Sequence, residues 1–235
     1  MTKPMNTAVP CAISKADIEY QQKALGEVSR TFALTIPLLP EKLEQAVGNA
    51  YLLCRIADTI EDDEALSNDD KAQFSQQLID LVNGADGSDS YATQLAHQLG
   101  NNTPEGERDL VANTGQVLDI TRQLSSGQIE AINTCVSSMA TGMPEFQQNL
   151  SASGLPDMAT LNSYCYYVAG VVGEMLTKLF CDYSEKIAHR REALTKLAFS
   201  FGQGLQLTNI LKDIWVDQKR GVCWLPQDLF SGYGY

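Results

Sequence analysis

Apolar residues recur at helical spacing along most of this chain, and the clearest such pattern also carries a row of polar side chains. The apolar positions of this stretch are Leu52, Leu53, Ile56, Ala57 and Ile60. They predict one amphipathic helix over residues 40–63. The polar positions are Tyr51, Arg55, Asp58 and Asp62. Their spacing of i, i+4, i+7 and i+11 places them on one stripe of that helix.

A second stripe of the same kind lies in residues 204–221. Its polar positions are Gln206, Asn209, Asp213 and Asp217, and its apolar neighbours are Leu207, Ile210, Leu211 and Ile214. We expect both stripes to line one shared interior cavity. Two unit charges about 4 Å apart cost about 4 kcal/mol at an effective dielectric near 20, so the aspartates need a positive partner. Mg²⁺ takes carboxylate oxygens together with substrate phosphates, and it could supply that charge.

The rest of the pattern predicts an all-α chain. Ser14 is a suitable N-cap for a first helix through Val28, and Ser67 or Asn68 begins a helix that ends at Gly84. Residues 108–143 and 160–180 read as one helix each, with Pro144 closing or kinking the former. Strand patterns are absent from the sequence. We therefore expect a disordered tail over residues 1–14 and a single helical domain over residues 15–235.

Composition narrows the partners and the compartment. The formal net charge is -12, which argues against a nucleic-acid partner because phosphates attract Lys and Arg. No apolar run of about 18 residues predicts a transmembrane helix. The six cysteines show no C-x-x-C pairing, as expected of buried thiols in a reducing compartment. We expect a cytoplasmic protein that can associate peripherally with the inner face of a membrane.

Four motifs together resemble the squalene/phytoene synthase family. They are SRTFALTIP at residues 29–37, DTIEDD at 58–63, YCYYVAGVVGEML at 164–176 and QLTNILKDIWVDQKRGVCWLP at 206–226. They follow the family's order, and the DTIEDD and YVAG segments are most similar to bacterial squalene synthases. The resemblance implies an isoprenoid-synthase helical bundle around a central cavity. Family members continue with further helices that close the cavity, so the resemblance also implies that helices are missing at the C-terminal end.

The resemblance implies a role for each polar position. The implied metal ligands are Asp58, Glu61, Asp62, Asp213 and Asp217. The implied substrate-binding residues are Ser29, Arg30, Phe32, Arg55, Gln206, Asn209, Lys212 and Arg220. Tyr51 and Tyr164 would act as catalytic residues beside the departing diphosphate, together with the four aspartates of the two stripes. Phe32 fits a place in the core equally well, and the two amides could instead bond between helices.

The implied reaction is a Mg²⁺-dependent head-to-head condensation of two farnesyl diphosphates, followed by reduction with NADPH to squalene. No G-x-G-x-x-G motif follows a predicted strand, so NADPH would bind in the same cavity. Two alternatives stay open. The chain could be a phytoene or dehydrosqualene synthase, which takes geranylgeranyl or farnesyl diphosphate without NADPH. It could also be a catalytically silent family member that acts as an assembly or interaction protein.

Overall fold

The computed structural model describes residues 13–147 and 151–229 and consists of helices joined by short turns. The first half contains α1 (Lys15–Val28), α2 (Phe32–Thr35), η1 (Ile36–Leu38), α3 (Glu41–Asp62), α4 (Asn68–Val82), α5 (Ser88–Gln98), α6 (Glu105–Ala112) and α7 (Thr114–Arg122). The second half contains α8 (Ser126–Gln147), α9 (Met158–Cys165), η2 (Tyr166–Gly170), α10 (Val171–Tyr183), α11 (Glu185–Ala188), α12 (Arg191–Lys219) and η3 (Gln227–Leu229). The described residues contain one isolated bridge, between Leu155 and Pro226, and no strand. The all-α prediction is confirmed.

Local sequence signals fix several helix ends as predicted. The Ser14 side chain accepts from the Asp17 backbone amide at the start of α1. Ser67 and Asp70 form a reciprocal capping box at the start of α4, which satisfies two backbone donors that a helix start would otherwise leave unpaired. The predicted tail over residues 1–14 lies almost entirely outside the described residues.

Two predicted helices differ from the structure. Residues 108–143 are divided among α6, α7 and α8 rather than forming one helix. The first break falls at Asn113, whose side-chain amide donates to the Asp109 carbonyl at 2.8 Å and so competes with the continuing helix. Pro144 does not end α8, which continues to Gln147. Residues 160–180 are interrupted by a single π-helical turn, η2, of the kind that often marks a functional site.

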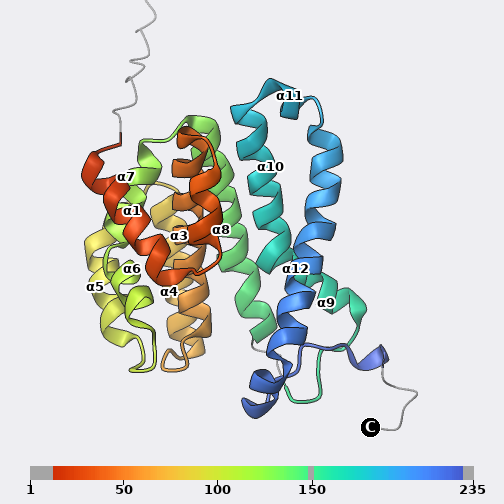
Figure 1. Ribbon diagram of the computed structural model, residues 1–235. Helices are drawn as coiled ribbons and strands as arrows, with labels where there is room; N and C mark the ends of the chain where they lie inside the picture. The colour runs from red at the N-terminus through yellow and green to blue at the C-terminus, as the bar shows by residue number, and fades with distance from the viewer. Residues whose placement is uncertain (1–12, 148–150, 230–235) are drawn as a thin grey trace, which may run out of the picture.

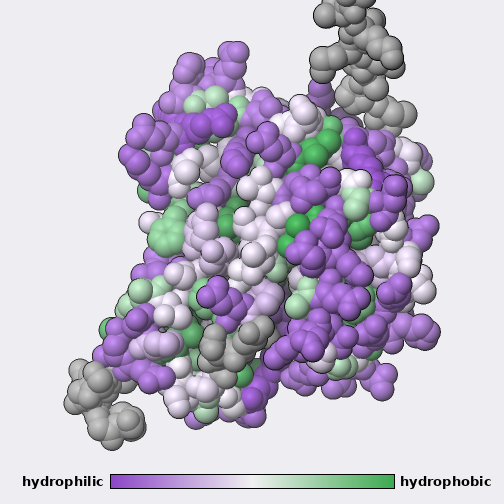
Figure 2. Space-filling model, turned by 180° about the vertical axis from the view of Figure 1, so that it is seen from behind, coloured by the Kyte–Doolittle hydropathy of each residue, from purple (hydrophilic) through white to green (hydrophobic). Residues whose placement is uncertain are grey.

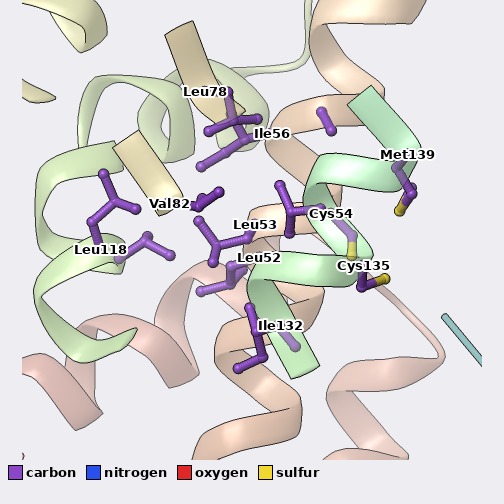
Figure 3. Packing of buried hydrophobic residues seen from close by; sticks show 14 of the residues in the cluster. Leu52, Leu53, Cys54, Ile56, Leu78, Val82, Leu118, Ile132, Cys135 and Met139 are labelled. Atoms are coloured by element: carbon purple, nitrogen blue, oxygen red, sulfur yellow. The ribbon is translucent and has the colours of Figure 1, made fainter. Parts of the chain in front are cut away.

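The helices form two groups on either side of α8 (Figure 1). Helices α1 and α3–α7 lie on one side of α8, and α9–α12 lie on the other. The core of the first group gathers side chains from four helices that point toward one another (Figure 3). The labelled ones are Leu52, Leu53, Cys54 and Ile56 of α3, Leu78 and Val82 of α4, Leu118 of α7, and Ile132, Cys135 and Met139 of α8. This packing fixes α3 firmly at the centre of the molecule.

Close backbone approach fixes α12 against α10. A Cβ added to Gly173 would lie 2.9 Å from the Ala198 carbonyl oxygen, so only a glycine permits this contact. A Cβ added to Gly202 would lie 2.7 Å from the backbone of Ala169 in η2. A mid-helix glycine costs about 1 kcal/mol relative to alanine, and the close approach to Ala198 explains why Gly173 stands inside α10.

The surface is mainly hydrophilic on the face opposite that of Figure 1, where hydrophobic residues form small separate groups (Figure 2). Large apolar side chains are nevertheless exposed along α12. They are Leu197, Phe201, Leu205, Leu211, Trp215 and Val216. None of the described helices is long and apolar enough to cross a membrane. The five described cysteines are free thiols; four of them are buried, as expected, and Cys223 is half-buried.

Candidate functional site

A cleft of about 580 Å³ lies between the C-terminal halves of α3 and α12. Its lining also includes residues of α8, α9 and η2 and of the segment that follows α12. Six carboxylates line it: Asp58, Glu61, Asp62, Glu64, Asp213 and Asp217. Three cations line it as well: Arg55, Lys212 and Arg220. Apart from Tyr51, the residues of the two polar stripes therefore line one cavity, in which negative charge is in excess.

The excess of negative charge affects the pKa of Asp58. Its side chain is 31% exposed. Desolvation, with a smaller effect of the neighbouring Asp62 charge, raises its pKa to about 7 from the ordinary 3.8, against the opposing effect of Arg55. Desolvation also raises the pKa of Asp217 on the opposite helix. The cleft thus holds carboxylates that would gain from a nearby cation.

Cations join the carboxylates at three points. On α3, Arg55 pairs with Glu107 of α6, and its Nη1 lies 3.8 Å from Asp58 Oδ2. At the far end of the cleft, Arg220 Nη2 lies 3.0 Å from Glu64 Oε1, and this exposed pair links the chain after α3 to the end of α12. On α12 itself, Lys212 Nζ lies 3.3 Å from Asp213 Oδ2.

Tyr164 lies deepest among the polar residues of the cleft. The side chain is buried, and its ring stacks on that of Trp224 with centroids 3.9 Å apart. The Gln206 side-chain amide donates to its hydroxyl at 3.4 Å. Burial raises the pKa of Tyr164 well above its ordinary value, and the charges of nearby acidic groups such as Glu61 and Asp62 add to the rise. The phenol therefore keeps its proton near neutral pH.

With this geometry in hand, comparison with known proteins decides the family. The family model for squalene/phytoene synthase matches residues 25–235. The chain belongs to the squalene/phytoene synthase family.

Curated members of the family are similar at about 30% identity. The squalene synthase of Gibberella zeae is 30% identical over 209 residues, which cover 88% of this chain and 43% of that protein. The squalene synthase of Dictyostelium discoideum is 31% identical over 218 residues, covering 92% of this chain and 48% of that protein. The chain thus spans less than half the length of these two relatives.

Solved structures of the family share the fold. A ligand complex of TcSQS has a TM-score of 0.77 and 26% identity, with 94% of this chain and 61% of that chain covered. A dehydrosqualene synthase in complex with a ligand has a TM-score of 0.53 and 25% identity, with 94% of this chain and 64% of that chain covered. The predicted isoprenoid-synthase bundle agrees with these neighbours.

The family's expected site residues fall into two groups in space. Eleven of them line the cleft: Arg55, Asp58, Glu61, Asp62, Tyr164, Gln206, Asn209, Lys212, Asp213, Asp217 and Arg220. The other four, Ser29, Arg30, Phe32 and Tyr51, are not among its lining residues. Tyr51 stands midway along α3, and its hydroxyl donates to the Val28 carbonyl, next to Ser29, at 3.4 Å. Phe32 contacts the Tyr51 ring at 5.2 Å and is 48% exposed, so it is not a plain core residue.

The family's metal chemistry suits the donors of this cleft. Among the residues that the structure describes, no three His, Cys, Asp or Glu side chains converge closely enough to hold a metal ion by themselves. The carboxylates are instead divided between two walls. Mg²⁺ is commonly held by one or two carboxylates and by substrate phosphates. Oxygen donors, excess negative charge and the raised pKa of Asp58 fit an ion shared between the protein and an anionic ligand.

Sequence reasoning did not single out several residues in or beside this site. Glu64 lies one residue beyond the DTIEDD motif, and its pairing with Arg220 has no sequence signal. Trp224 belongs to the last motif, but its stacking on Tyr164 could not be inferred from spacing. Glu107 stands in the first turn of α6, where an acid is common because it complements the helix dipole. The helix dipole alone explains an acid at this position, so nothing in the sequence indicated its contact with Arg55.

Proposed function

We propose that this protein catalyses the Mg²⁺-dependent head-to-head condensation of two farnesyl diphosphates to presqualene diphosphate. It then converts presqualene diphosphate to squalene with NADPH. The single observation that carries the proposal is the meeting of the α3 and α12 carboxylates across one cleft in a member of this family. The reaction belongs to the whole protein, and the chain spans part of its relatives' length.

The polar end of the cleft would bind the diphosphate. Asp58, Glu61 and Asp62 would hold metal from α3, and Asp213 and Asp217 would hold it from α12. Bound Mg²⁺ would neutralise the diphosphate and stabilise its departure. Because a planar guanidinium can contact two phosphate oxygens at once, Arg55 and Arg220 would orient the leaving group, with Lys212 as a third cation. Arg30 and Ser29, which precede the Phe32 that contacts Tyr51, would extend this recognition beyond the cleft.

The inner part of the cleft would shelter the developing allylic cation. Met143, Val168 and Trp224 line it together with Tyr164. Apolar walls exclude water, and an aromatic face stabilises a cation by about 0.5–2 kcal/mol. Tyr164 would donate a hydrogen bond near the leaving group, oriented by Gln206. Asn209, whose side chain also lines the cleft, would contact the substrate or a metal-bound water.

The second chemical step would need a hydride, which NADPH supplies when bound. Lys212 and the arginines of the cleft are suited to its phosphates. The product is a polyprenyl hydrocarbon that partitions into lipid, so we expect a peripheral association with membrane. A phytoene or dehydrosqualene synthase would share the cleft and need no reductant. The similarity in fold to a dehydrosqualene synthase supports this second candidate function.

Product analysis distinguishes these functions. The protein is incubated with Mg²⁺ and either farnesyl or geranylgeranyl diphosphate, with and without NADPH, and the products are identified by mass. Squalene formed only with farnesyl diphosphate and NADPH supports the proposal. Dehydrosqualene or phytoene formed without NADPH favours the alternative. No release of diphosphate under any condition favours the silent, assembly-type family member.

Substitutions on the two walls test the shared cleft. Asp58→Asn and Asp213→Asn, made separately, should each abolish condensation with little loss of helical fold, because each removes a carboxylate from a different helix. Asp86→Asn provides the control, since Asp86 is exposed in the turn before α5. Full activity in either cleft variant would contradict the proposal.

A further inference from the structure

Glu107 of α6 touches the cleft indirectly, through Arg55. Its side chain is 13% exposed and forms an ion pair with the Arg55 guanidinium. Its second carboxylate oxygen lies 3.3 Å from the Thr59 hydroxyl on the next turn of α3. Glu107 is not among the residues that line the cleft between α3 and α12. Glu107 therefore binds Arg55 from outside the cleft.

The backbone that carries Glu107 is itself anchored to α3. The preceding loop is fixed by Asp63, whose carboxylate accepts from the Gly100 amide at 3.1 Å and from the Thr103 hydroxyl at 2.5 Å. Arg108 donates to the Gly100 carbonyl at 2.5 Å and to the Ala96 carbonyl at 3.2 Å. These bonds place the first turn of α6 beside Arg55. The position of the Glu107 carboxylate is thus set by the fold rather than by a flexible side chain.

Arg55 has a competing partner inside the cleft. Its Nη1 already lies 3.8 Å from Asp58 Oδ2. Of the three cations that line the cleft, Arg55 alone comes from α3. If the guanidinium moved fully onto Asp58, it would neutralise the carboxylate that suits a metal and would cease to face an incoming anion. Glu107 offers a second, well-anchored carboxylate that restrains this movement.

We infer that Glu107 is a positioning residue: it holds Arg55 away from Asp58, so that Asp58 remains free for a divalent cation and Arg55 for the diphosphate. The inference rests on the proposed function for the identity of the two ligands. The orientation of Arg55 can be measured without them. Glu107 does not touch the reacting atoms, and its effect is carried entirely by Arg55.

The experiment compares four variants with the wild-type protein. Glu107→Ala removes the restraint, and Glu107→Gln keeps an acceptor for Arg55. Arg55→Gln combined with Glu107→Ala removes the competitor as well. Glu105→Ala is the matched control, because Glu105 is exposed in the same first turn of α6. Affinity for Mg²⁺ alone, and then for inorganic pyrophosphate with Mg²⁺, is measured by calorimetry, and a crystal structure of Glu107→Ala locates Arg55.

We expect Glu107→Ala to weaken Mg²⁺ and pyrophosphate binding at least tenfold, with Arg55 moved onto Asp58 in the crystal structure. Glu107→Gln should recover part of the loss, and Glu105→Ala should bind as wild type. The double variant should regain Mg²⁺ affinity but not pyrophosphate affinity, a split that a general loss of fold would not produce. Wild-type affinity in Glu107→Ala, or an unmoved Arg55, would overturn the inference. If the wild-type protein binds neither ligand, the proposed function fails, and the position of Arg55 in the Glu107→Ala crystal decides the inference alone.

Discussion

The rings of Tyr164 and Trp224 lie nearly parallel, 15° apart, with their centroids separated by 3.9 Å. Tyr164 comes from α9, and Trp224 comes from the segment after α12. The Leu155 amide donates to the Leu225 carbonyl at 3.0 Å, and the Gln227 amide donates to the Leu155 carbonyl at 2.8 Å. The chain that leaves α12 is therefore bound back against the start of α9 and forms part of the cleft wall.

Replacing Trp224 should weaken both the fold and the reaction. Trp224→Ala removes the stacked ring, and an aromatic pair contributes about 0.5–1.5 kcal/mol beyond the area it buries. We expect the free energy of unfolding, measured in urea, to fall by at least that amount and turnover to fall at least tenfold. Trp224→Phe should keep most of the stability and most of the activity. Trp215→Ala serves as the control, because Trp215 is 70% exposed. Equal effects of the two alanine variants would contradict this assignment.

The raised pKa of Asp58 predicts how stability depends on pH in the metal-free protein. The folded state holds a proton on Asp58 up to about pH 7, and the unfolded chain releases it near 3.8. Because the folded state binds the proton more tightly, this group lowers the free energy of unfolding as pH rises through that window. Asp58→Asn should therefore raise stability by about 1 to 2 kcal/mol near neutral pH, after allowance for solvent screening, and by nothing near pH 4.

Thermal unfolding with and without Mg²⁺ checks the same group as a ligand. The ion should stabilise the wild-type protein above pH 7 and stabilise Asp58→Asn much less, because binding to the folded state raises apparent stability. Asp86→Asn should respond to Mg²⁺ as the wild type does. An equal response in Asp58→Asn would remove Asp58 from the metal-binding set.

The contact between α10 and α12 should be sensitive to one methyl group. Gly173→Ala would place a Cβ 2.9 Å from the Ala198 carbonyl oxygen. The helices would have to separate, which typically costs 1–3 kcal/mol. The movement would also displace the α12 carboxylates, so activity should fall together with stability. Denaturant unfolding and an activity assay measure the two effects.

Gly204→Ala is the matched change on α12 itself. A Cβ at Gly204 meets no atom within 4 Å, and alanine favours a helix by up to about 1 kcal/mol over glycine. We expect this variant to be slightly more stable than the wild type and equally active. A loss of stability as large as that of Gly173→Ala would refute the packing argument.

Tyr164 should contribute a hydrogen bond and no titration in the working pH range. Its pKa lies well above the ordinary value, so the phenol stays protonated at any pH used for the assay. Tyr164→Phe should lower kcat about tenfold to a hundredfold and leave the shape of the pH–rate profile between roughly pH 7 and 9 unchanged. Tyr167→Phe is the control. A limb that rises with pH and disappears in Tyr164→Phe would instead identify Tyr164 as a base, because a base acts only when deprotonated.

Local sequence determined the helices and the contents of their faces. Periodicity alone located α3 and α12 and placed acids on one stripe of each, because side chains three and four residues apart share a helix face. Capping chemistry at Ser14 and Ser67 fixed two helix starts. Local signals failed where neighbours decided, as in the division of residues 108–143 among three helices.

Tertiary structure decided what the stripes face and what supports them. The packing of α12 on α10 through Gly173 brings Asp213 to the wall of the cleft opposite Asp58. The periodicity within either helix does not predict that the two helices meet. The pairing of Glu107 with Arg55, 52 residues apart in sequence, follows from the anchoring of α6 by Asp63. A helix specifies its own faces through contacts a few residues apart, whereas the partner of each face depends on long-range packing.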